Sequence, residues 1–399
     1  MTNSKYVPKR RFKEFELYDE WNLLKLDEVA KYRNGKAHEN SISLQGKFIV
    51  VNSKFISTNG EVKKFTDLQI EPIFKNEISF VLSDVPNGRA IARTFLIDQN
   101  DKYTLNQRIA AITPNRNISP YYLYVLLNRN KYFLEFDDGV KQTNLSKGDV
   151  LEFKEYYPIS KEQFMIGDFF QTIDSLITLH QHKLDKLKNL KKSYLSELFP
   201  EEGERVPKRR FPGFEGEWEE KKLKDVSEIY DGTHQTPRYT TDGIMFLSVE
   251  NIKTLKSNKY ISKDDFIKDF KIFPQNGDVL MTRIGDIGTS NVVNTDDKLA
   301  FYVSLALIRS AQLDSNFLNT SISSVNFQKE LWSRTLHIAF PKKINKNEIG
   351  EVSILFPSIS EQKQIGSFFQ NLDKSVTLQQ QKLDKLKDLK KAYLNELFV

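Results

Sequence analysis

The chain has 399 residues, with 59 Lys and Arg against 53 Asp and Glu, and a formal net charge of +6. This length predicts two or more domains, each with its own core. With 39% hydrophobic residues and no cysteine, the composition excludes disorder, disulfides, thiolate catalysis and cysteine-based zinc sites. No apolar run approaches the roughly 20 residues that cross a bilayer. We therefore expect a cytoplasmic protein without membrane contact, with a mild bias towards a polyanionic partner.

Two segments, near residues 20–155 and 217–352, have the same mixed character but look unlike each other over most of their length. Short apolar runs alternate with turn-forming polar stretches, which indicates short strands and short helices in an α+β arrangement. The predicted strands are 48–52, 78–82, 109–113, 244–249, 278–282 and 300–308, and the predicted short helices are 121–128 and 317–325.

A tandem duplication surrounds these segments. Residues 162–199 and 361–398 align without a gap at an offset of 199, and 25 of the 38 positions are identical. The hexapeptide VPKRRF at 7–12 recurs at 206–211 with the same offset. Two copies are too few for a solenoid. Because the repeated segments are alike and the segments between them differ, the sequence predicts one architecture that holds two different recognition modules. The alternative is a duplicated enzyme with two diverging active sites.

Each long repeat predicts a single helix with an apolar seam. Its seam residues step by four and three over more than four heptads, which is the a/d pattern of a coiled coil. The seam positions are Ile166, Phe170, Ile173, Ile177, His180, Leu184, Leu187, Lys191, Tyr194 and Leu198 in the first copy, and the residues 199 positions later in the second.

The ends and the partner of each helix can also be predicted. Ser160 with Gln163, and Ser358 with Glu361, have capping-box spacing. About 38 residues at about 1.5 Å per residue give a rod of roughly 57 Å, whose seam needs a partner. The other copy is tethered nearby, so we expect an antiparallel pair with pseudo-twofold symmetry. Polar seam residues, expected to fix its register, are His180, Lys191, Gln379 and Lys390.

Motifs that carry chemistry are missing from the sequence. It has no G-x-x-x-x-G-K-[ST] or G-x-G-x-x-G loop for nucleotides, and no H-E-x-x-H metal motif. It also lacks the N-P-P-[FY] or D-P-P-Y step with which amino-methylating enzymes hold a flipped base. We therefore expect no catalytic residue and no metal site, and a binding protein rather than an enzyme.

Polar loops in both segments carry side chains suited to DNA. Arg can pair with guanine and Asn or Gln with adenine in the major groove, while Lys, Ser and Thr near glycine suit phosphates. For each loop taken alone, an ordinary solvated turn is favoured about three to one, and only the loops together favour DNA. The loops are 33–36, 87–93, 106–108, 141–144, 231–239, 282–288 and 289–291.

Several short motifs complete the pattern. Each long helix is preceded by Pro-(x)3-Glu-Gln, at Pro158 and Pro357, and carries an L-D-K-L-K-x-L-K-K run. The second segment has a Gly-Asp-Val-Leu step at 277–280 and the loop DGTHQTP at 231–237, whereas the first has Lys-Asn-Glu-Ile at 75–78 in place of Gly-Asp-Ile. With the doubled architecture, these motifs make the whole chain resemble the specificity subunit of type I restriction-modification systems (the HsdS family).

The resemblance implies two globular target-recognition domains separated by two long antiparallel coiled-coil helices, each domain reading one half of a split, asymmetric DNA site. It implies partners as well: double-stranded DNA, two methyltransferase subunits and motor-nuclease subunits. This chain would hold no cofactor, since the partners would use S-adenosylmethionine, ATP and Mg²⁺. The implied division is residues 1–155, first recognition domain; 156–205, first helical spacer; 206–352, second recognition domain; and 353–399, second spacer.

Loop chemistry and the resemblance together select candidate DNA-binding residues. In the first half they are Lys36, Arg89, Arg108, Gln142 and Asn144, and in the second Gln235, Arg238, Tyr239, Arg283 and Asn291. The repeated Lys-Arg-Arg at 9–11 and 208–210 is interpreted as a solvated linker, with contact to phosphate or an acidic partner surface as the alternative. A protein-only scaffold with two peptide-binding heads on a coiled-coil spacer is the competing function, and an enzyme of unrecognised type is the third.

Overall fold

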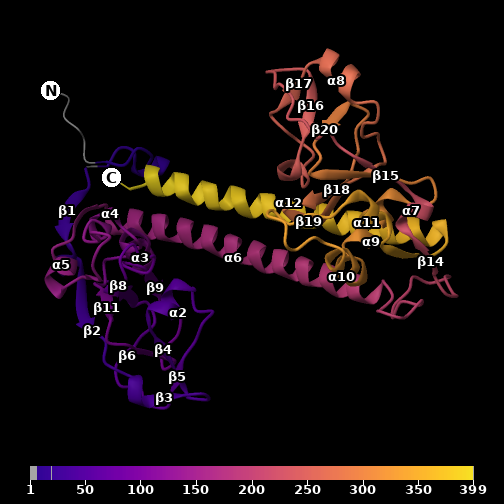
Figure 1. Ribbon diagram of the computed structural model, residues 1–399. Helices are drawn as coiled ribbons and strands as arrows, with labels where there is room; N and C mark the ends of the chain where they lie inside the picture. Colours follow the sequence, from indigo (N-terminus) through magenta and orange to yellow (C-terminus); the bar gives the residue numbers. More distant parts are fainter. Residues whose placement is uncertain (1–6, 19, 399) are drawn as a thin grey trace. The chain divides into compact units, whose positions relative to one another are not determined.

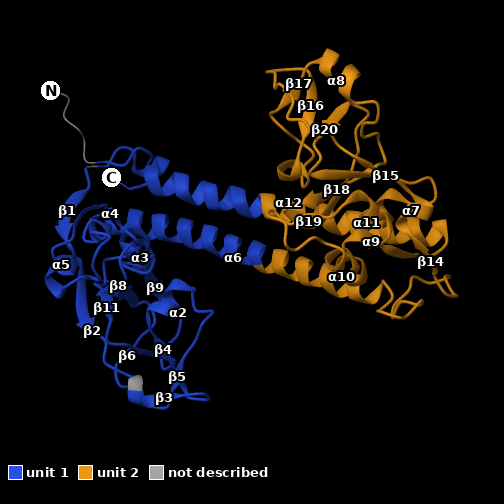
Figure 2. Ribbon diagram, viewed as in Figure 1, with its two compact units in different colours: residues 1–181, 382–399 blue, residues 182–381 orange. Residues whose placement is uncertain are grey.

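The computed structural model describes residues 7–18 and 20–398, apart from the side chain of Glu39. The chain forms two compact units (Figure 2). Unit 1 comprises residues 1–181 and 382–399, and unit 2 comprises residues 182–381. Two long helices, α6 (Ser160–Glu197) and α12 (Ile359–Glu396), each contribute residues to both units. Within the described residues, no helix is long and apolar enough to span a bilayer.

The predicted long helices are confirmed. Both have 38 residues, and all ten predicted seam positions of each copy are buried or half-buried, the last of them, Leu198 and Leu397, directly after the helix ends. In unit 1 the ring of Phe169 on α6 lies 4.8 Å from that of Tyr393 on α12, and in unit 2 Tyr194 lies 4.9 Å from Phe368. Residues early in one helix meet residues late in the other, so the pair is antiparallel within each unit.

Unit 1 adds an α+β domain to its helix pair (Figure 1). Its sheets have the strand orders β3-β5-β4-β10-β6, β2-β11-β7-β9, β12-β8 and β1-β13. The elements are η1 (Lys13–Phe15), β1 (Asn22–Lys25), α1 (Leu26–Val29), β2 (Ala30–Asn34), η2 (Glu39–Ser41), β3 (Ile42–Ser43), β4 (Phe48–Val51), α2 (Ser53–Ser57), β5 (Phe65–Thr66), β6 (Pro72–Ile73), β7 (Ile78–Val81), β8 (Ser83–Asp84), β9 (Thr94–Leu96), β10 (Tyr103–Leu105), β11 (Ile109–Pro114), α3 (Pro120–Leu127), α4 (Lys131–Leu134), β12 (Thr143–Asn144), α5 (Lys147–Leu151) and β13 (Lys154–Tyr157).

Unit 2 is built in the same way. Its strand orders are β15-β21-β18-β19, β17-β16-β20 and β14-β22. The elements are β14 (Glu219–Lys222), α7 (Leu223–Val226), β15 (Glu228–Asp231), β16 (Ile244–Leu247), η3 (Val249–Asn251), β17 (Tyr260–Ile261), α8 (Lys263–Asp269), β18 (Val279–Ile284), β19 (Asp286–Val292), β20 (Leu299–Phe301), β21 (Leu305–Arg309), α9 (Ser315–Ile322), α10 (Val325–Ser333), α11 (Lys346–Gly350) and β22 (Ser353–Phe356).

The two α+β domains share a topology despite their different sequences. The antiparallel order β2-β11-β7-β9 in unit 1 corresponds to β15-β21-β18-β19 in unit 2. The parallel pair β10 with β4 corresponds to β20 with β16. The hydrophobic core of each domain also includes seam residues, such as Ile166 and Phe170 in unit 1 and Ile365 and Phe369 in unit 2. Each domain therefore shares its core with its own part of the helix pair.

The divergent motif at 75–78 builds the same turn as its counterpart in unit 2. The backbone N–H of Phe74 donates to the Glu77 carboxylate at 2.8 Å, and the N–H of Gln275 donates to Asp278 at 2.8 Å. Asn76 and Gly277 both have positive φ, at 70° and 91°. Asn tolerates this left-handed conformation better than other residues with a Cβ, so it can replace glycine here.

Most short elements match the sequence prediction, with three corrections. The stretches 282–288 and 289–291, predicted as polar loops, lie largely in strands β18 and β19, so Arg283 and Asn291 are strand residues. The predicted strand 300–308 is wrong, because the chain turns at residues 302–304 and passes from β20, paired with β16, to β21, paired with β15 and β18. The predicted capping boxes are confirmed only in part. Ser160 is already inside α6, so the first box is wrong. Ser358 directly precedes α12 and accepts from the N–H of Glu361 at 3.5 Å, but the Glu361 side chain binds Arg210 instead of completing the box.

Candidate DNA-recognition surfaces

The repeated Lys-Arg-Arg segment is a clasp on the helix pair in each unit. Arg11 donates from Nε and Nη2 to Glu162 at 2.8 and 2.7 Å, and Arg210 makes the same two bonds to Glu361. Both carboxylates are 1% exposed. These hydrogen bonds raise the pKa of both guanidinium groups. The prediction of a solvated linker is therefore wrong for these two arginines, because each is the counter-ion of a buried glutamate.

The preceding arginine completes the clasp from the other helix. The backbone N–H of Arg10 donates to the carbonyl of Glu396 at 2.8 Å, and Arg209 does the same to Glu197. Their guanidinium groups form ion pairs with the same glutamates at 2.5 and 2.7 Å. Each clasp thus holds the beginning of one helix and the end of the other.

Glu-Gln, the dipeptide near the start of each long helix, also positions the α+β domain. Gln163 accepts from the N–H of Ser119, the N-cap of α3, at 3.3 Å, and Gln362 accepts from Asp314, the N-cap of α9, at 2.9 Å. A Cβ on Gly167 would lie 2.7 Å from the Ser119 hydroxyl. The equivalent Gly366 would place one 2.7 Å from the backbone nitrogen of Phe317. Only glycine allows α3 and α9 to approach so closely.

Two of the predicted polar seam residues form ion pairs within their own units. Lys390 lies 2.6 Å from Asp174 in unit 1, and Lys191 lies 2.5 Å from Asp373 in unit 2. The aspartates are themselves 199 residues apart, a repeat that sequence reasoning missed because the lysine partners could not be paired without the antiparallel register. Because the pairs form only in one alignment of the helices, they fix the register of the seam.

In unit 1, three predicted DNA-binding residues come together beside β8 and β12. Gln142 donates from Nε2 to the Ser83 hydroxyl at 2.8 Å and to Asn144 Oδ1 at 3.2 Å. The carbonyl of Arg108 accepts from Leu82, the residue before β8, at 3.0 Å. Side chains of Arg108, Gln142 and Asn144 are exposed. One basic and two amide side chains therefore share one surface.

Lys36 follows β2 and bridges to Asn106 across the backbone. Gly35 before it has no space for a Cβ, which would lie 2.0 Å from the Asn106 carbonyl oxygen, so the backbones pack directly. The Lys36 ammonium is largely exposed and lies 3.1 Å from Glu71. The Lys36 ammonium therefore extends the surface formed by Arg108, Gln142 and Asn144, although the Glu71 carboxylate already pairs with it.

Arg89 lies in a loop of unit 1 that an aspartate organises. Asp84 accepts from the N–H groups of Ala90 and Ile91 at 2.5 and 3.1 Å. Arg93 donates to the Arg89 carbonyl at 2.5 Å. Arg129, which sequence analysis missed, approaches the carbonyls of Gly88 and Ile91 at 3.4 Å. Its pKa is lowered by burial and by neighbouring Arg93, so this loop gathers positive charge.

In unit 2, the predicted residues Gln235, Arg238 and Tyr239 are exposed on the loop after β15. The Tyr239 ring packs edge-on against Phe246 at 5.6 Å. The ammonium of Lys259, another residue that the sequence did not single out, lies 5.7 Å from the Tyr239 ring centre and 2.7 Å from Glu250. Tyr239 is thus held at the domain surface with a cation over its ring.

Arg283 and Asn291 are placed differently. Arg283 is buried, forms an ion pair with Asp231 and donates from Nε to the carbonyl of Ile344 at 3.1 Å. Burial lowers its pKa. Asn291 donates to the carbonyls of Ile252 and Lys253 at 2.9 and 3.1 Å. In this conformation both side chains bind the domain's own loops.

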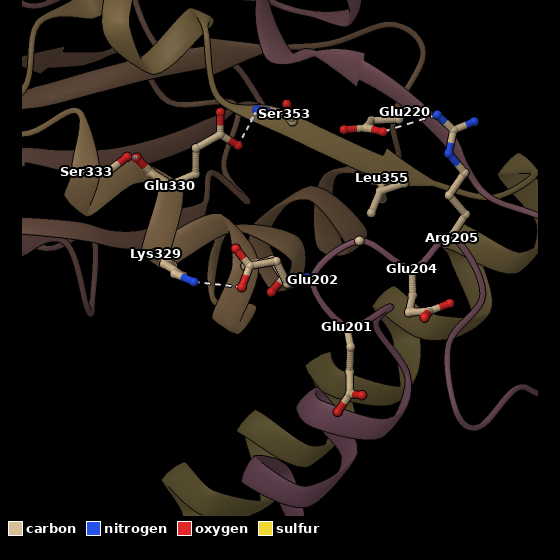
Figure 3. A pocket seen from close by; sticks show the side chains of 12 residues that line it. Glu201, Glu202, Glu204, Arg205, Glu220, Lys329, Glu330, Ser333, Ser353 and Leu355 are labelled. Carbon is tan, nitrogen blue, oxygen red and sulfur yellow. Dashed lines mark hydrogen bonds and ion pairs between the residues drawn. The ribbon is translucent and has the colours of Figure 1, made fainter.

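An acidic pocket of about 400 Å³ lies in unit 2, lined in part by residues 201–205, which follow α6 (Figure 3). Its lining includes Glu201 and Glu204, and an ion pair joins Glu202 to Lys329 at 2.7 Å. Carboxylates repel phosphate, so this pocket is not a candidate for contact with DNA. Among the described residues, this pocket included, no three His, Asp or Glu side chains gather in a way that could hold a metal ion.

Comparison with known proteins identifies the family. Residues 18–189 and 215–388 each match the type I restriction modification DNA specificity domain. The chain belongs to this family, since the two matches cover most of its length. It is 21% identical over 414 positions to the type I restriction enzyme MjaVIII specificity subunit of Methanocaldococcus jannaschii, covering 98% of this chain and 96% of the relative.

Solved structures have the same fold. The S subunit of a type I restriction-modification system from M. genitalium matches with a TM-score of 0.70 at 15% identity, covering 98% of this chain and 99% of that one. A chain from a study of complex assembly and conformational transition in a type I R-M system matches with a TM-score of 0.50 at 19% identity, covering 95% and 97%. The predicted α+β class with an antiparallel pair of long helices is confirmed.

Proposed function

We propose that this chain is the sequence-specific DNA-recognition subunit of a type I restriction-modification complex and reads a bipartite, asymmetric site. The observation that carries the proposal is one α+β topology used twice with different exposed side chains. Unit 1 presents Arg108, Gln142 and Asn144 together, and unit 2 presents Gln235, Arg238 and Tyr239. Two unlike surfaces on one fold suit two unlike half-sites, so the site should not be palindromic.

The candidate residues divide by chemistry into two groups. Arg108, Gln142, Asn144, Gln235 and Arg238 have the exposed donors and acceptors for base edges, whereas Lys36 and Arg89 suit phosphates. Tyr239 offers an exposed ring for apolar contact. For Arg283 and Asn291 we propose a structural role without base contact, since their polar groups already bind within the domain.

The partners proposed are double-stranded DNA, two methyltransferase subunits and motor-nuclease subunits. Methylation would use S-adenosylmethionine on the methyltransferases, and cleavage would use ATP and Mg²⁺ on the motor-nuclease, with none of these cofactors in this chain. We propose recognition domains at 1–155 and 206–352, with helical spacers at 156–205 and 353–399. The complex would act in the cytoplasm, where chromosomal and incoming DNA are both accessible.

The decisive experiment maps N6-methyladenine in cells with and without the gene for this chain. A split motif that disappears with the gene supports the proposal, and an unchanged map contradicts it. Replacing residues 20–155 by the corresponding segment of another family member should change one half of the motif and leave the other half intact. Changes in both halves would contradict the assignment of one half-site to each domain.

A two-headed protein-binding scaffold is the alternative function. Salt dependence separates the two functions. Each phosphate that the protein neutralises releases counterions, which makes the slope of log K against log salt concentration more negative by about 0.9. Steeply salt-dependent binding to the mapped motif supports DNA recognition. Binding that is equal on all sequences, or insensitive to salt, would favour the scaffold.

A further inference from the structure

A loop of unit 2, residues 335–343, exposes large apolar side chains. The side chain of Ile338 is 98% exposed and that of Phe340 is fully exposed, and both lie at the tip of the loop. The sequence of this loop, TLHIAFPKK, contains no acidic residue and ends in Lys342 and Lys343. Burying an exposed Phe or Ile is favourable by about 1.5–3 kcal/mol, so a partner that covers both side chains would gain binding energy.

The base of the loop is held firmly, although its tip is bare. The ring of Trp332 on α10 lies 4.5 Å from that of His337, and the ammonium of Lys342 lies 4.5 Å from the Trp332 ring centre. The N–H of Leu336 donates to the carbonyl of Lys343 at 2.8 Å, which closes the loop. The tip is therefore a narrow projection on a fixed base.

The loop is also joined to the edge of the recognition domain. The N–H of Gly285, between β18 and β19, donates to the carbonyl of Lys342 at 2.8 Å, and the N–H of Ile344 donates to the backbone carbonyl of Arg283 at 3.0 Å. In unit 1, the N–H of Leu145 makes the equivalent bond to Leu82 at 2.8 Å. The 335–343 loop thus occupies the place that in unit 1 carries Gln142 and Asn144, two of the proposed base-reading residues.

We propose that the 335–343 loop is a wedge that inserts Phe340 between two base pairs of the bound duplex, with Lys342 and Lys343 next to the flanking phosphates. The inference rests on the proposed function, since it needs DNA on this domain. Apolar side chains of this kind partly unstack a base step and kink the duplex. A narrow apolar tip followed by two lysines fits a base step, whereas a protein interface needs about 800 Å² on each partner.

Unit 1 provides an internal contrast. Its equivalent loop, 136–144, exposes Val140 and part of Phe136, whose ring packs against Tyr132, but it also contains Asp137 and Asp138, which would repel the phosphates beside an inserted side chain. Its exposed amides instead suit hydrogen bonds to base edges. The wedge is therefore specific to the half-site that unit 2 reads.

The test uses the full-length chain, assembled with its methyltransferase subunits, and duplexes that carry the mapped motif. 2-Aminopurine, which becomes brighter when it is unstacked, is placed at each position of the unit 2 half-site in turn. Apart from the adenine that the methyltransferase flips, wild type should brighten one base step. Phe340→Ala should lose this signal and bind the motif about tenfold more weakly, since stacking of a base on an aromatic ring contributes about 1–3 kcal/mol. Phe340→Trp should retain both.

Controls separate the possible outcomes. Ile267→Ala on α8 removes a side chain that is also exposed, and should change neither signal nor affinity. If Phe340→Ala binds and brightens as wild type does, the wedge is wrong although the proposed function stands. If it instead weakens only copurification with the methyltransferase, the loop is a protein contact and the wedge is again wrong. A wild-type complex without motif-specific binding would contradict the proposed function itself.

Discussion

Removing the guanidinium of Arg210 would leave the Glu361 carboxylate buried without a counter-ion. The two side chains are 14% and 1% exposed, and they share two hydrogen bonds of 2.8 and 2.7 Å. Breaking such a pair by removing one partner costs about 3–5 kcal/mol, because the remaining charge loses its partner but not its burial. We expect Arg210→Ala to lower the free energy of unfolding of unit 2 by about 3 kcal/mol, the low end, since Arg210 is itself slightly exposed.

The neighbouring residue supplies a matched control. Arg209 pairs with Glu197 at 2.7 Å, but the side chains are 57% and 29% exposed. Solvent screens this pair, so Arg209→Ala should lower the free energy of unfolding by about 1 kcal/mol or less. The same substitution one residue apart thus separates a buried ion pair from an exposed one.

The assay is urea denaturation, with unfolding monitored by hydrogen exchange of peptides from 206–212 and 359–372, which report on unit 2 alone. The double variant Arg210→Met with Glu361→Met removes both charges and should lose less stability than Arg210→Ala. Equal losses for Arg209→Ala and Arg210→Ala would refute the reasoning. The reasoning would also fail if the double variant lost as much stability as Arg210→Met and Glu361→Met lose in total when made singly.

Three further substitutions test other contacts. Gly366→Ala should destabilise unit 2 by about 1–3 kcal/mol in thermal unfolding, despite the better helix propensity of alanine, because its Cβ would lie 2.7 Å from the nitrogen of Phe317. Lys390→Asp should destabilise unit 1 by about 1 kcal/mol, and adding Asp174→Lys should restore most of the loss in the same measurement. Arg283→Met should lower the melting temperature but leave every base of the mapped methylation motif unchanged, because the guanidinium is buried against Asp231.

The long helices could be predicted because their signal lies within one segment. A seam that repeats every three and four residues specifies both the helix and its buried face, whatever packs against it. The ends were less predictable, since Ser160 and Gln163 have the spacing of a cap but Gln163 instead binds the N-terminus of α3. Tertiary contacts of this kind leave no trace in local spacing.

Other features required the three-dimensional structure for similar reasons. The apolar run at 300–308 is continuous in sequence, and only the pairing of its two ends with different sheets shows that it is two strands. Arg210 and Glu361 are 151 residues apart, so their charges could not be matched from the sequence. Exposed and buried arginines also look alike in sequence, so the sequence cannot distinguish Arg283, buried in β18, from the exposed Arg238.

The shared contacts explain how two domains can keep one fold and still present different surfaces. The turns around Glu77 and Asp278, and the glutamines that bind α3 and α9, depend on interior residues and backbone groups. None of these contacts uses the tips of the loops. Loop sequences can therefore diverge at little cost in stability, so that one domain exposes amides where the other exposes Phe340. A fold stabilised this way can acquire a new half-site on one domain without disturbing the other.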